Sequence, residues 1–139
     1  MDRLIQGRTI VEGVAQGRVL VSDQPLSFWG GYDQNSGEII DRRHPLSGQS
    51  AAGRILAIPS SRGSSTTTAV LLEAIRAGTA PVAILTTGTD HFFALASIVA
   101  DEMYGTSLPI VALNEVDFAG LRSGQWLQLR TGGLVAVIS

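Results

Sequence analysis

The sequence predicts an α/β fold with about two helices, in which the middle of the chain forms a right-handed α/β layer and the β-rich ends curl into a barrel or a sandwich. Three observations support this prediction. Short strand patterns bounded by glycine occupy both ends of the chain, and the middle alternates between apolar runs and helical patterns. A hydroxyl-rich turn, residues 59–68, joins one apolar run to the first helical pattern. No repeat or linker interrupts the 139 residues, so we expect a single domain over residues 1–139.

The first third of the chain is predicted to form strands followed by a loop. The strand patterns lie at residues 9–11 and 17–21. Residues 27–33 then place three aromatic side chains around a double glycine. Two interpretations of this cluster stay open, an exposed contact surface and a plug for one end of a barrel. The charged stretch at residues 41–46 is interpreted as a solvated loop or as one wall of a site.

The remainder of the chain is predicted to alternate strands with helices and to end in a hairpin. Buried strands are expected at residues 55–58, 81–85 and 108–113, and the closing hairpin at residues 124–138.

Two helical patterns separate these strands. Residues 65–77 have apolar positions at helical spacing, and Gly78 follows them as a C-terminal cap. Residues 90–104 form the second pattern, with Asp90 as its N-terminal cap. His91 falls in the first turn of this helix, where an exposed polar residue is ordinary.

The hydroxyl-rich turn is the candidate functional site. The start of a helix leaves backbone N–H groups unpaired, and such a turn can bind an anion. Gly63 lets the backbone approach a ligand closely, and Arg62 can grip a carboxylate or phosphate with two hydrogen bonds. The alternative is that the hydroxyl groups only cap the helix and stabilise the turn.

Composition excludes several kinds of chemistry. The chain contains no cysteine, which excludes disulfides, thiolate nucleophiles and any cysteine-ligated metal site built from this chain alone. The two histidines, His44 and His91, are far apart in sequence, so no metal site is predicted. All ten basic residues are arginine, which excludes a lysine base. The net charge of -2 argues against nucleic-acid or membrane-surface binding.

No apolar run approaches the length of a membrane span, and the N-terminus lacks the apolar segment of a signal peptide. We therefore expect a cytoplasmic protein.

Four stretches of the chain together resemble the small subunit, or swivel domain, of the aconitase X family. The matching residues are 27–33, 37–48, 53–56 and 59–72. The resemblance implies a swivelling β/β/α domain with a barrel-like sheet. It also implies a dehydratase that is active only with a large subunit. The iron–sulfur cluster is expected on that large subunit, and no cofactor or metal ligand is expected on this chain.

The resemblance further implies that the substrate is a small hydroxy acid. Family members dehydrate cis-3-hydroxy-L-proline to 1-pyrroline-2-carboxylate in bacteria, or 5-phosphomevalonate in archaea. The lysine-free composition is typical of a GC-rich bacterium and favours the first substrate. The competing class is a non-catalytic module that binds an anion or docks on a larger protein.

The family's motif of a basic residue, glycine and serine falls on Arg62, Gly63 and Ser64. By this resemblance Ser64 is the expected proton acceptor. A serine hydroxyl is a poor base, so its alkoxide would need stabilisation from the helix start, from Arg62 and from the partner. Arg62 stands where many archaeal members have lysine, which leaves the substrate open. The expected substrate-binding residues are Ser60, Ser61, Arg62, Gly63 and Ser65.

Overall fold

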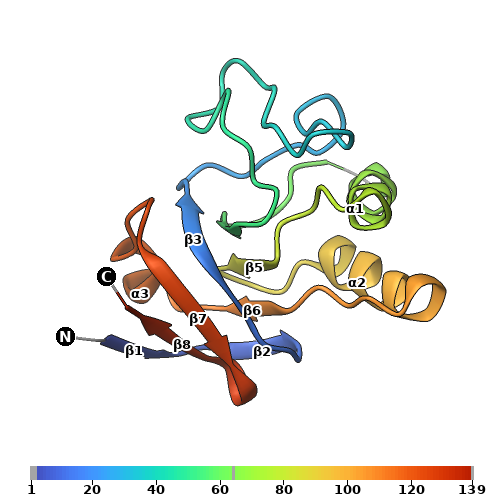
Figure 1. The fold of residues 1–139 in the computed structure, drawn as a ribbon. Coiled ribbons are helices and arrows are strands. Elements are labelled where there is room, and N and C mark those ends of the chain that lie inside the picture. The colour runs from blue at the N-terminus through green and yellow to red at the C-terminus, as the bar shows by residue number, and fades with distance from the viewer. Residues whose placement is uncertain (1–2, 64, 139) are drawn as a thin grey trace.

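An eight-stranded mixed sheet curls into a nearly closed barrel. The computed structural model describes residues 3–63 and 65–138 (Figure 1). The strand order is β1-β8-β7-β3-β4-β5-β6-β2. Strands β1 (Arg3–Gln6) and β2 (Arg8–Val11) lie at the two ends of this order, although only Gly7 separates them in the sequence. One short segment therefore supplies both edge strands and brings the two ends of the sheet together.

The central strands run parallel, and the outer strands run antiparallel to their neighbours. Strands β3 to β6 form the parallel part, whereas β1, β2, β7 and β8 pair in antiparallel fashion. The hairpin of β7 and β8 confirms the predicted closing hairpin. The bounds of the remaining strands are β3 (Ala15–Val21), β4 (Ile55–Ala57), β5 (Ala83–Thr86), β6 (Ile110–Ala112), β7 (Trp126–Arg130) and β8 (Leu134–Val137), with the 3-10 turn η1 (Thr131–Gly133) before β8.

The parallel strands are buried on both faces. Successive side chains of a strand point to opposite faces of the sheet. In β4, Leu56 belongs to the core beneath the helices, whereas Ile55 and Ala57 belong to the core inside the barrel. All three are fully buried. The carboxyl ends of these strands are therefore held by two packed cores.

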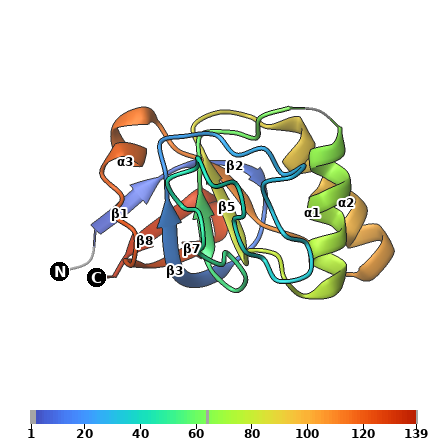
Figure 2. The same cartoon turned by 90° about the horizontal axis from the view of Figure 1, so that it is seen from above.

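Helices α1 (Thr66–Ala77) and α2 (His91–Tyr104) pack against each other on one side of the sheet (Figures 1 and 2). Both confirm the predicted helices, and α1 ends at Gly78 with φ of 78°. A third helix, α3 (Glu115–Ala119), lies on the other side of the molecule (Figure 1). The sequence did not predict α3 or β1, two short elements of five and four residues.

The aromatic cluster at residues 27–33 is divided between core and surface. The rings of Phe28 and Tyr32 stack at a centroid distance of 5.0 Å, and Phe93 of α2 meets Phe28 edge-on at 5.4 Å. These rings are buried in the core on the helix side of the sheet, whereas Trp29 is 72% exposed. The cluster therefore neither forms one exposed surface nor plugs the barrel.

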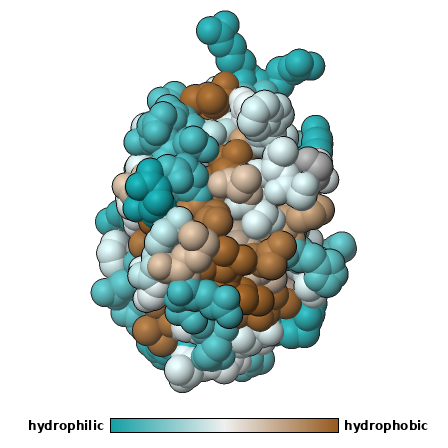
Figure 3. Space-filling view, turned by 90° about the vertical axis from the view of Figure 1, so that its right-hand side faces the viewer, coloured by the Kyte–Doolittle hydropathy of each residue, from teal (hydrophilic) through white to brown (hydrophobic). Residues whose placement is uncertain are grey.

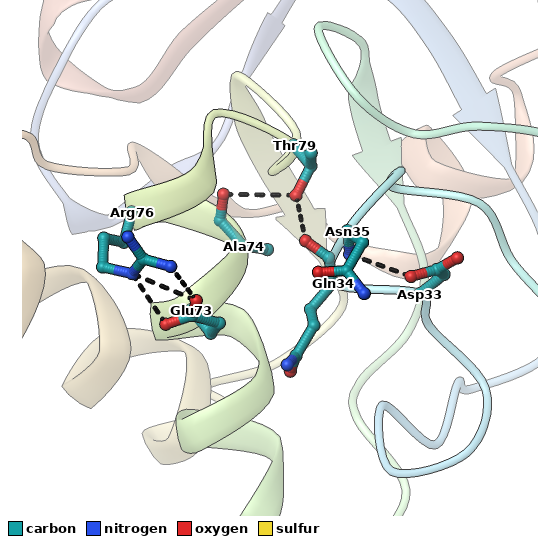
Figure 4. Close-up of polar contacts among 7 residues, drawn as sticks. All are labelled: Asp33, Gln34, Asn35, Glu73, Ala74, Arg76 and Thr79. Atoms are coloured by element: carbon teal, nitrogen blue, oxygen red, sulfur yellow. Dashed lines mark hydrogen bonds and ion pairs between the residues drawn. The ribbon is translucent and has the colours of Figure 1, made fainter.

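The loop at residues 33–37 anchors the carboxyl end of α1 (Figure 4). The Thr79 hydroxyl donates to the Gln34 carbonyl at 2.6 Å, and the Tyr32 hydroxyl donates to the Thr79 carbonyl at 2.8 Å. Burial raises the pKa of Tyr32 well above its ordinary value. This end of α1 lies at the amino edge of the parallel strands, remote from the hydroxyl-rich turn.

Within the described ranges, none of the three helices has the length and apolar character required to cross a bilayer.

Candidate active site

The hydroxyl-rich turn lies where the parallel strands β4 and β5 end. Residues 58–65 lead from β4 to α1, and residues 87–90 lead from β5 to α2. The Thr87 N–H donates to the Pro59 carbonyl at 3.3 Å, so the two connections run side by side. In parallel sheets this carboxyl edge is the usual place for a ligand, because the loops and the helix N-termini converge there.

Asp90 ties the hydroxyl-rich turn to α2. Its Oδ2 accepts hydrogen bonds from both the N–H and the hydroxyl of Ser61, each at 2.7 Å. Its Oδ1 accepts from the N–H groups of Phe92 and Phe93 at 3.0 and 3.1 Å. The residue is only 7% exposed, and the ion pairs found in the described part of the chain do not involve it. Four donors and the positive end of α2 therefore balance its charge.

The sequence identified only half of this role. Asp90 was predicted as the cap of α2, and the two bonds to Phe92 and Phe93 confirm that prediction. A capping pattern contains no information about a partner 29 residues away, so the link to Ser61 could not be predicted.

The segment after β3 holds the other side of the turn. The Arg62 N–H donates to the Leu26 carbonyl at 2.9 Å, and the Leu26 N–H donates to the Ser60 carbonyl at 3.3 Å. Leu26 is fully buried in the core on the helix side of the sheet. Buried contacts therefore restrain the turn from two directions.

His44 supports this segment from the charged stretch at residues 41–46. Its Nδ1 accepts from the Leu46 N–H at 3.1 Å, so Nε2 carries the proton and donates to the Gln24 carbonyl at 3.2 Å. Arg42 and Arg43 are exposed, as a solvated loop predicts, but His44 is 7% exposed. The solvated-loop interpretation is therefore wrong for His44, which braces the backbone near the turn.

Five of the six predicted site residues lie in the described part of the chain. Ser60 and Ser61 are partly buried, and the other three are exposed, namely Arg62, Gly63 and Ser65. The predicted proton acceptor, Ser64, lies outside the described residues.

Two details bear on the alternative that the turn only caps α1. Gly63 has φ of 118°, a conformation that a side chain would strain. Ser65 is the residue before α1, but its side chain forms no capping hydrogen bond. Capping therefore does not account for this hydroxyl.

Two backbone donors of the turn are already engaged. The Ser61 N–H bonds to Asp90, and the Arg62 N–H bonds to Leu26. An anion at this edge therefore depends on the Arg62 side chain and on the later part of the turn. Arg62 is exposed, and its guanidinium forms no ion pair with another described residue.

The comparison with known proteins decides the family. The family model of the aconitase X swivel domain matches residues 4–137. The chain belongs to the aconitase X swivel domain family. This confirms the resemblance recognised in the sequence.

Relatives of this swivel domain carry two different names. The chain is 51% identical over 131 residues to a Pseudomonas aeruginosa protein named cis-3-hydroxy-L-proline dehydratase, covering 94% of this chain and 22% of that protein. It is 37% identical over 134 residues to the phosphomevalonate dehydratase small subunit of Thermococcus onnurineus, covering 96% and 97% of the two chains. This swivel domain thus spans 22% of the first relative and almost the whole of the second.

A solved structure gives the same fold. The crystal structure of Thermococcus kodakaraensis aconitase X in its holo-form matches with a TM-score of 0.87 and 33% identity, covering 99% of both chains. This confirms the predicted fold, a barrel-like sheet with helices flanking a strand-turn-helix site.

The residues of this swivel domain do not fit a resident iron–sulfur cluster. Such clusters are held mainly by cysteine thiolates, and this chain has no cysteine. The described residues also contain no group of three or more histidine, aspartate or glutamate side chains placed to hold a metal ion. The ligands of any such cluster would have to come from residues outside this chain.

Cavities lie at both edges of the parallel strands. One of about 420 Å³ adjoins the turn at the carboxyl edge and is lined by residues that include Asp23, Pro59 and Thr87. A larger one, about 470 Å³, lies at the amino edge beside Val14 and Gly78, and no titratable side chain lines it. The larger of these two cavities is therefore not the one beside the hydroxyl-rich turn.

Proposed function

We propose that this chain is the swivel part of a dehydratase that converts cis-3-hydroxy-L-proline to 1-pyrroline-2-carboxylate. The observation that carries the proposal is the turn at the carboxyl edge, where Asp90 restrains Ser61 and Leu26 restrains Arg62, the first residue of the Arg-Gly-Ser motif, in a chain 51% identical to a protein of that name. The whole enzyme's reaction and substrate come to this chain as a proposal, because the chain spans 22% of that relative.

In this proposal Ser64 removes the proton from the substrate carbon, and Arg62 pairs with the substrate carboxylate. The start of α1 and the Arg62 guanidinium stabilise negative charge on the serine oxygen. A helix N-terminus contributes about 0.3–1 kcal/mol, which is less than one pKa unit of about 1.36 kcal/mol. The partner must therefore supply further stabilisation of the deprotonated serine. The neighbouring residues Ser60, Ser61, Gly63 and Ser65 shape the substrate site.

The proposal assigns the iron–sulfur cluster and the remaining catalytic groups to a large partner of the aconitase X type. Two facts support this assignment. This chain has no cysteine, and it matches 97% of the length of a relative that is named as a small subunit. The partner is either a separate chain or the rest of a longer protein. In the same proposal, the enzyme acts in the cytoplasm and binds neither nucleic acid nor a membrane.

We further propose that the large partner docks on an apolar face of α2. Leu95 and Ile98 lie about one helical turn apart and are 50% and 54% exposed. Figure 3 shows apolar side chains gathered in the lower half of the face that carries the helices. Because Asp90 caps the start of α2 and binds Ser61, a partner seated on the first turns of α2 would also reach the hydroxyl-rich turn.

A second candidate function is the small subunit of phosphomevalonate dehydratase. The match to the Thermococcus onnurineus protein over almost its whole length favours it. A third is a non-catalytic module that binds an anion at the same turn.

The test is co-expression of this chain with its large partner, followed by assays of both substrates. We expect turnover of cis-3-hydroxy-L-proline, complete loss of turnover in Ser64→Ala, and none by the isolated chain. Ser36→Ala is the matched control. The Ser36 hydroxyl accepts a hydrogen bond from the Glu38 N–H in the loop at the carboxyl end of α1, away from the candidate site. Near wild-type turnover by Ser64→Ala would overturn the role of Ser64. Turnover of phosphomevalonate alone would favour the phosphomevalonate dehydratase subunit. Binding of a ligand without turnover would favour the non-catalytic module.

A further inference from the structure

We propose that His44 is a positioning residue for the hydroxyl-rich turn. By bonding to the Gln24 carbonyl, it closes a gap in the pairing between the segment after β3 and the connection after β4. It thereby fixes the place of Arg62 in the candidate site. The expected effect on turnover rests on the proposed function, whereas the effect on the turn itself does not.

The gap lies between two parts of a parallel ladder. Strand β3 pairs with β4 as far as Val21 and Ala57, and the Ser22 N–H extends this pairing with a bond to the Ala57 carbonyl at 3.0 Å. The pairing resumes where Leu26 meets Ser61. Between these two points the segment after β3 is one residue longer than the connection after β4, so the two segments are out of step.

Gln24 lies in the middle of this gap and is held by side chains. Its N–H donates to the Ser22 hydroxyl at 3.0 Å, and its carbonyl accepts from Nε2 of His44 at 3.2 Å. The next residue, Pro25, has no N–H to donate. Two side-chain bonds therefore hold the backbone where the ladder is interrupted.

The His44 ring is itself fixed in place. Its Nδ1 accepts from the Leu46 N–H at 3.1 Å, and Leu46 is buried in the core on the helix side of the sheet. The ring is 7% exposed. Because both ring nitrogens have a backbone partner, the ring cannot turn without breaking a hydrogen bond in a largely buried place. The Gln24 carbonyl is therefore tied to the core through His44.

The position of Gln24 is passed on to the turn. Two residues later, the Leu26 N–H donates to the Ser60 carbonyl at 3.3 Å, and the Leu26 carbonyl accepts from the Arg62 N–H at 2.9 Å. A segment with one extra residue can shift along its partner when nothing holds it. The bond from His44 to Gln24 therefore limits where Arg62 can lie.

The expected effect is intermediate, because the turn has a second restraint. Asp90 still accepts from the N–H and the hydroxyl of Ser61 when His44 is replaced. A misplacement of about 1 Å in a site can cost about 100-fold in rate. With one of the two restraints lost, we expect kcat/KM to fall by about tenfold.

Two variants separate the two bonds of His44. In His44→Asn the amide oxygen can take the place of Nδ1 and accept from the Leu46 N–H, but the side chain is too short to reach Gln24. In His44→Gln the terminal NH₂ group can take the place of Nε2 and donate to Gln24, while the bond to Leu46 is lost. Both variants lose the packing of the ring, so a difference between them reports the bond to Gln24.

Amide hydrogen exchange measures the turn without any need for turnover. NMR on the isotope-labelled chain, bound to its unlabelled large partner, gives the exchange rate of the Arg62 N–H. We expect exchange at least about tenfold faster in His44→Asn and within about threefold of the wild type in His44→Gln. For cis-3-hydroxy-L-proline, kcat/KM should fall by about tenfold in His44→Asn and by about twofold in His44→Gln.

Ser97→Ala is the matched control. Ser97 is fully buried in α2, and its hydroxyl also bonds to a backbone N–H and a backbone carbonyl, both of Leu108 at 2.8 Å. Leu108 lies just before β6, at the amino edge of the parallel strands. The variant should lower the free energy of unfolding in urea, yet leave the exchange of the Arg62 N–H and kcat/KM within about twofold of the wild type.

Equal exchange rates of the Arg62 N–H in His44→Asn and His44→Gln would overturn the inference. A kcat/KM that follows the free energy of unfolding across all three variants would also overturn it, since His44 would then serve stability alone. If the His44 variants do not fold, Ser22→Ala decides, because it removes the other bond that holds Gln24. It should speed the exchange of the Arg62 N–H by at least about fivefold, and an unchanged rate would reject the inference.

The proposed function can fail separately. The expected exchange rates in an assembled enzyme that does not dehydrate cis-3-hydroxy-L-proline would reject the proposed function and leave the role of His44 in placing the turn. Dehydration of that substrate together with equal exchange rates in the two His44 variants would do the reverse.

Discussion

The two edges of the parallel strands differ in chemistry and in volume. At the carboxyl edge, Asp90 binds Ser61, the neighbour of Arg62 in sequence, beside the N-termini of α1 and α2. At the amino edge lies the larger cavity, about 470 Å³, without a titratable lining. Every helix that follows a parallel strand starts at the carboxyl edge, so positive helix ends and loop side chains gather there. Strand direction, rather than cavity volume, therefore indicates the edge that carries the candidate site.

After the loss of turnover expected in Ser64→Ala, the next largest expected effect compares the two edges directly. In the assembled enzyme, Arg62→Ala should lower kcat/KM by about 100-fold, because it removes a charged partner of the substrate. Val14→Ser, in the wall of the amino-edge cavity, should change kcat/KM by less than about twofold. Steady-state kinetics on purified complexes measures both. A greater loss in Val14→Ser than in Arg62→Ala would move the site to the amino edge.

The same comparison can be made along α2. Leu95 lies about one turn after Asp90, whereas Met103, 61% exposed, lies near the amino edge. Leu95→Ser should weaken association with the large partner by about tenfold, and Met103→Ser by less than about twofold. Calorimetric titration of this chain with its partner tests this. The reverse order of effects would place the partner at the amino edge.

Local signals in the sequence predicted much of the carboxyl edge. The apolar run before the turn, the helical spacing after it and the glycine at position 78 define β4 and α1. Asp90 was recognised as a cap because a capping residue and its helix are neighbours in sequence.

The missing parts depend on contacts between distant residues. The bond from Ser61 to Asp90 joins two separate connections, and the buried His44 ring is hydrogen-bonded to the carbonyl of Gln24, 20 residues away. Neither contact has a local pattern. Strand β1 gains its partner only when β8, at the other end of the chain, folds against it. These features arise from tertiary packing, which residue spacing does not contain.

At the amino edge we expect effects on stability rather than on activity. Tyr32→Phe removes the hydrogen bond to the Thr79 carbonyl and should cost about 1 kcal/mol at pH 7. Burial raises the pKa of Tyr32 in the folded state, so its contribution is complete below the unfolded pKa of about 10 and is lost as the pH rises above it. The loss is at most about 1.36 kcal/mol per pH unit.

The phenylalanine variant lacks this alkaline loss, so its deficit relative to the wild type should shrink between pH 10 and pH 11. Urea unfolding at pH 7, 10 and 11 measures the difference. Tyr104→Phe serves as control, because Tyr104 is 38% exposed near the end of α2. A deficit that stays constant with pH would contradict the burial argument.

The smallest effect is expected at the ion pair of Arg76 and Glu73 on the last turns of α1 (Figure 4). The hydrogen bond from Arg76 lowers the pKa of Glu73, so the pair contributes above the ordinary carboxylate pKa and loses its contribution as the pH falls below it. Both side chains face solvent, where salt screens the attraction and ordering the side chains offsets it. Arg76→Ala should therefore shift Tm by no more than about 1 °C and leave kcat/KM unchanged. Thermal unfolding and kinetics at low and high salt measure both quantities. A loss of activity in Arg76→Ala would show that a charge at the amino edge of the parallel strands affects the reaction, which would contradict the contrast between the two edges.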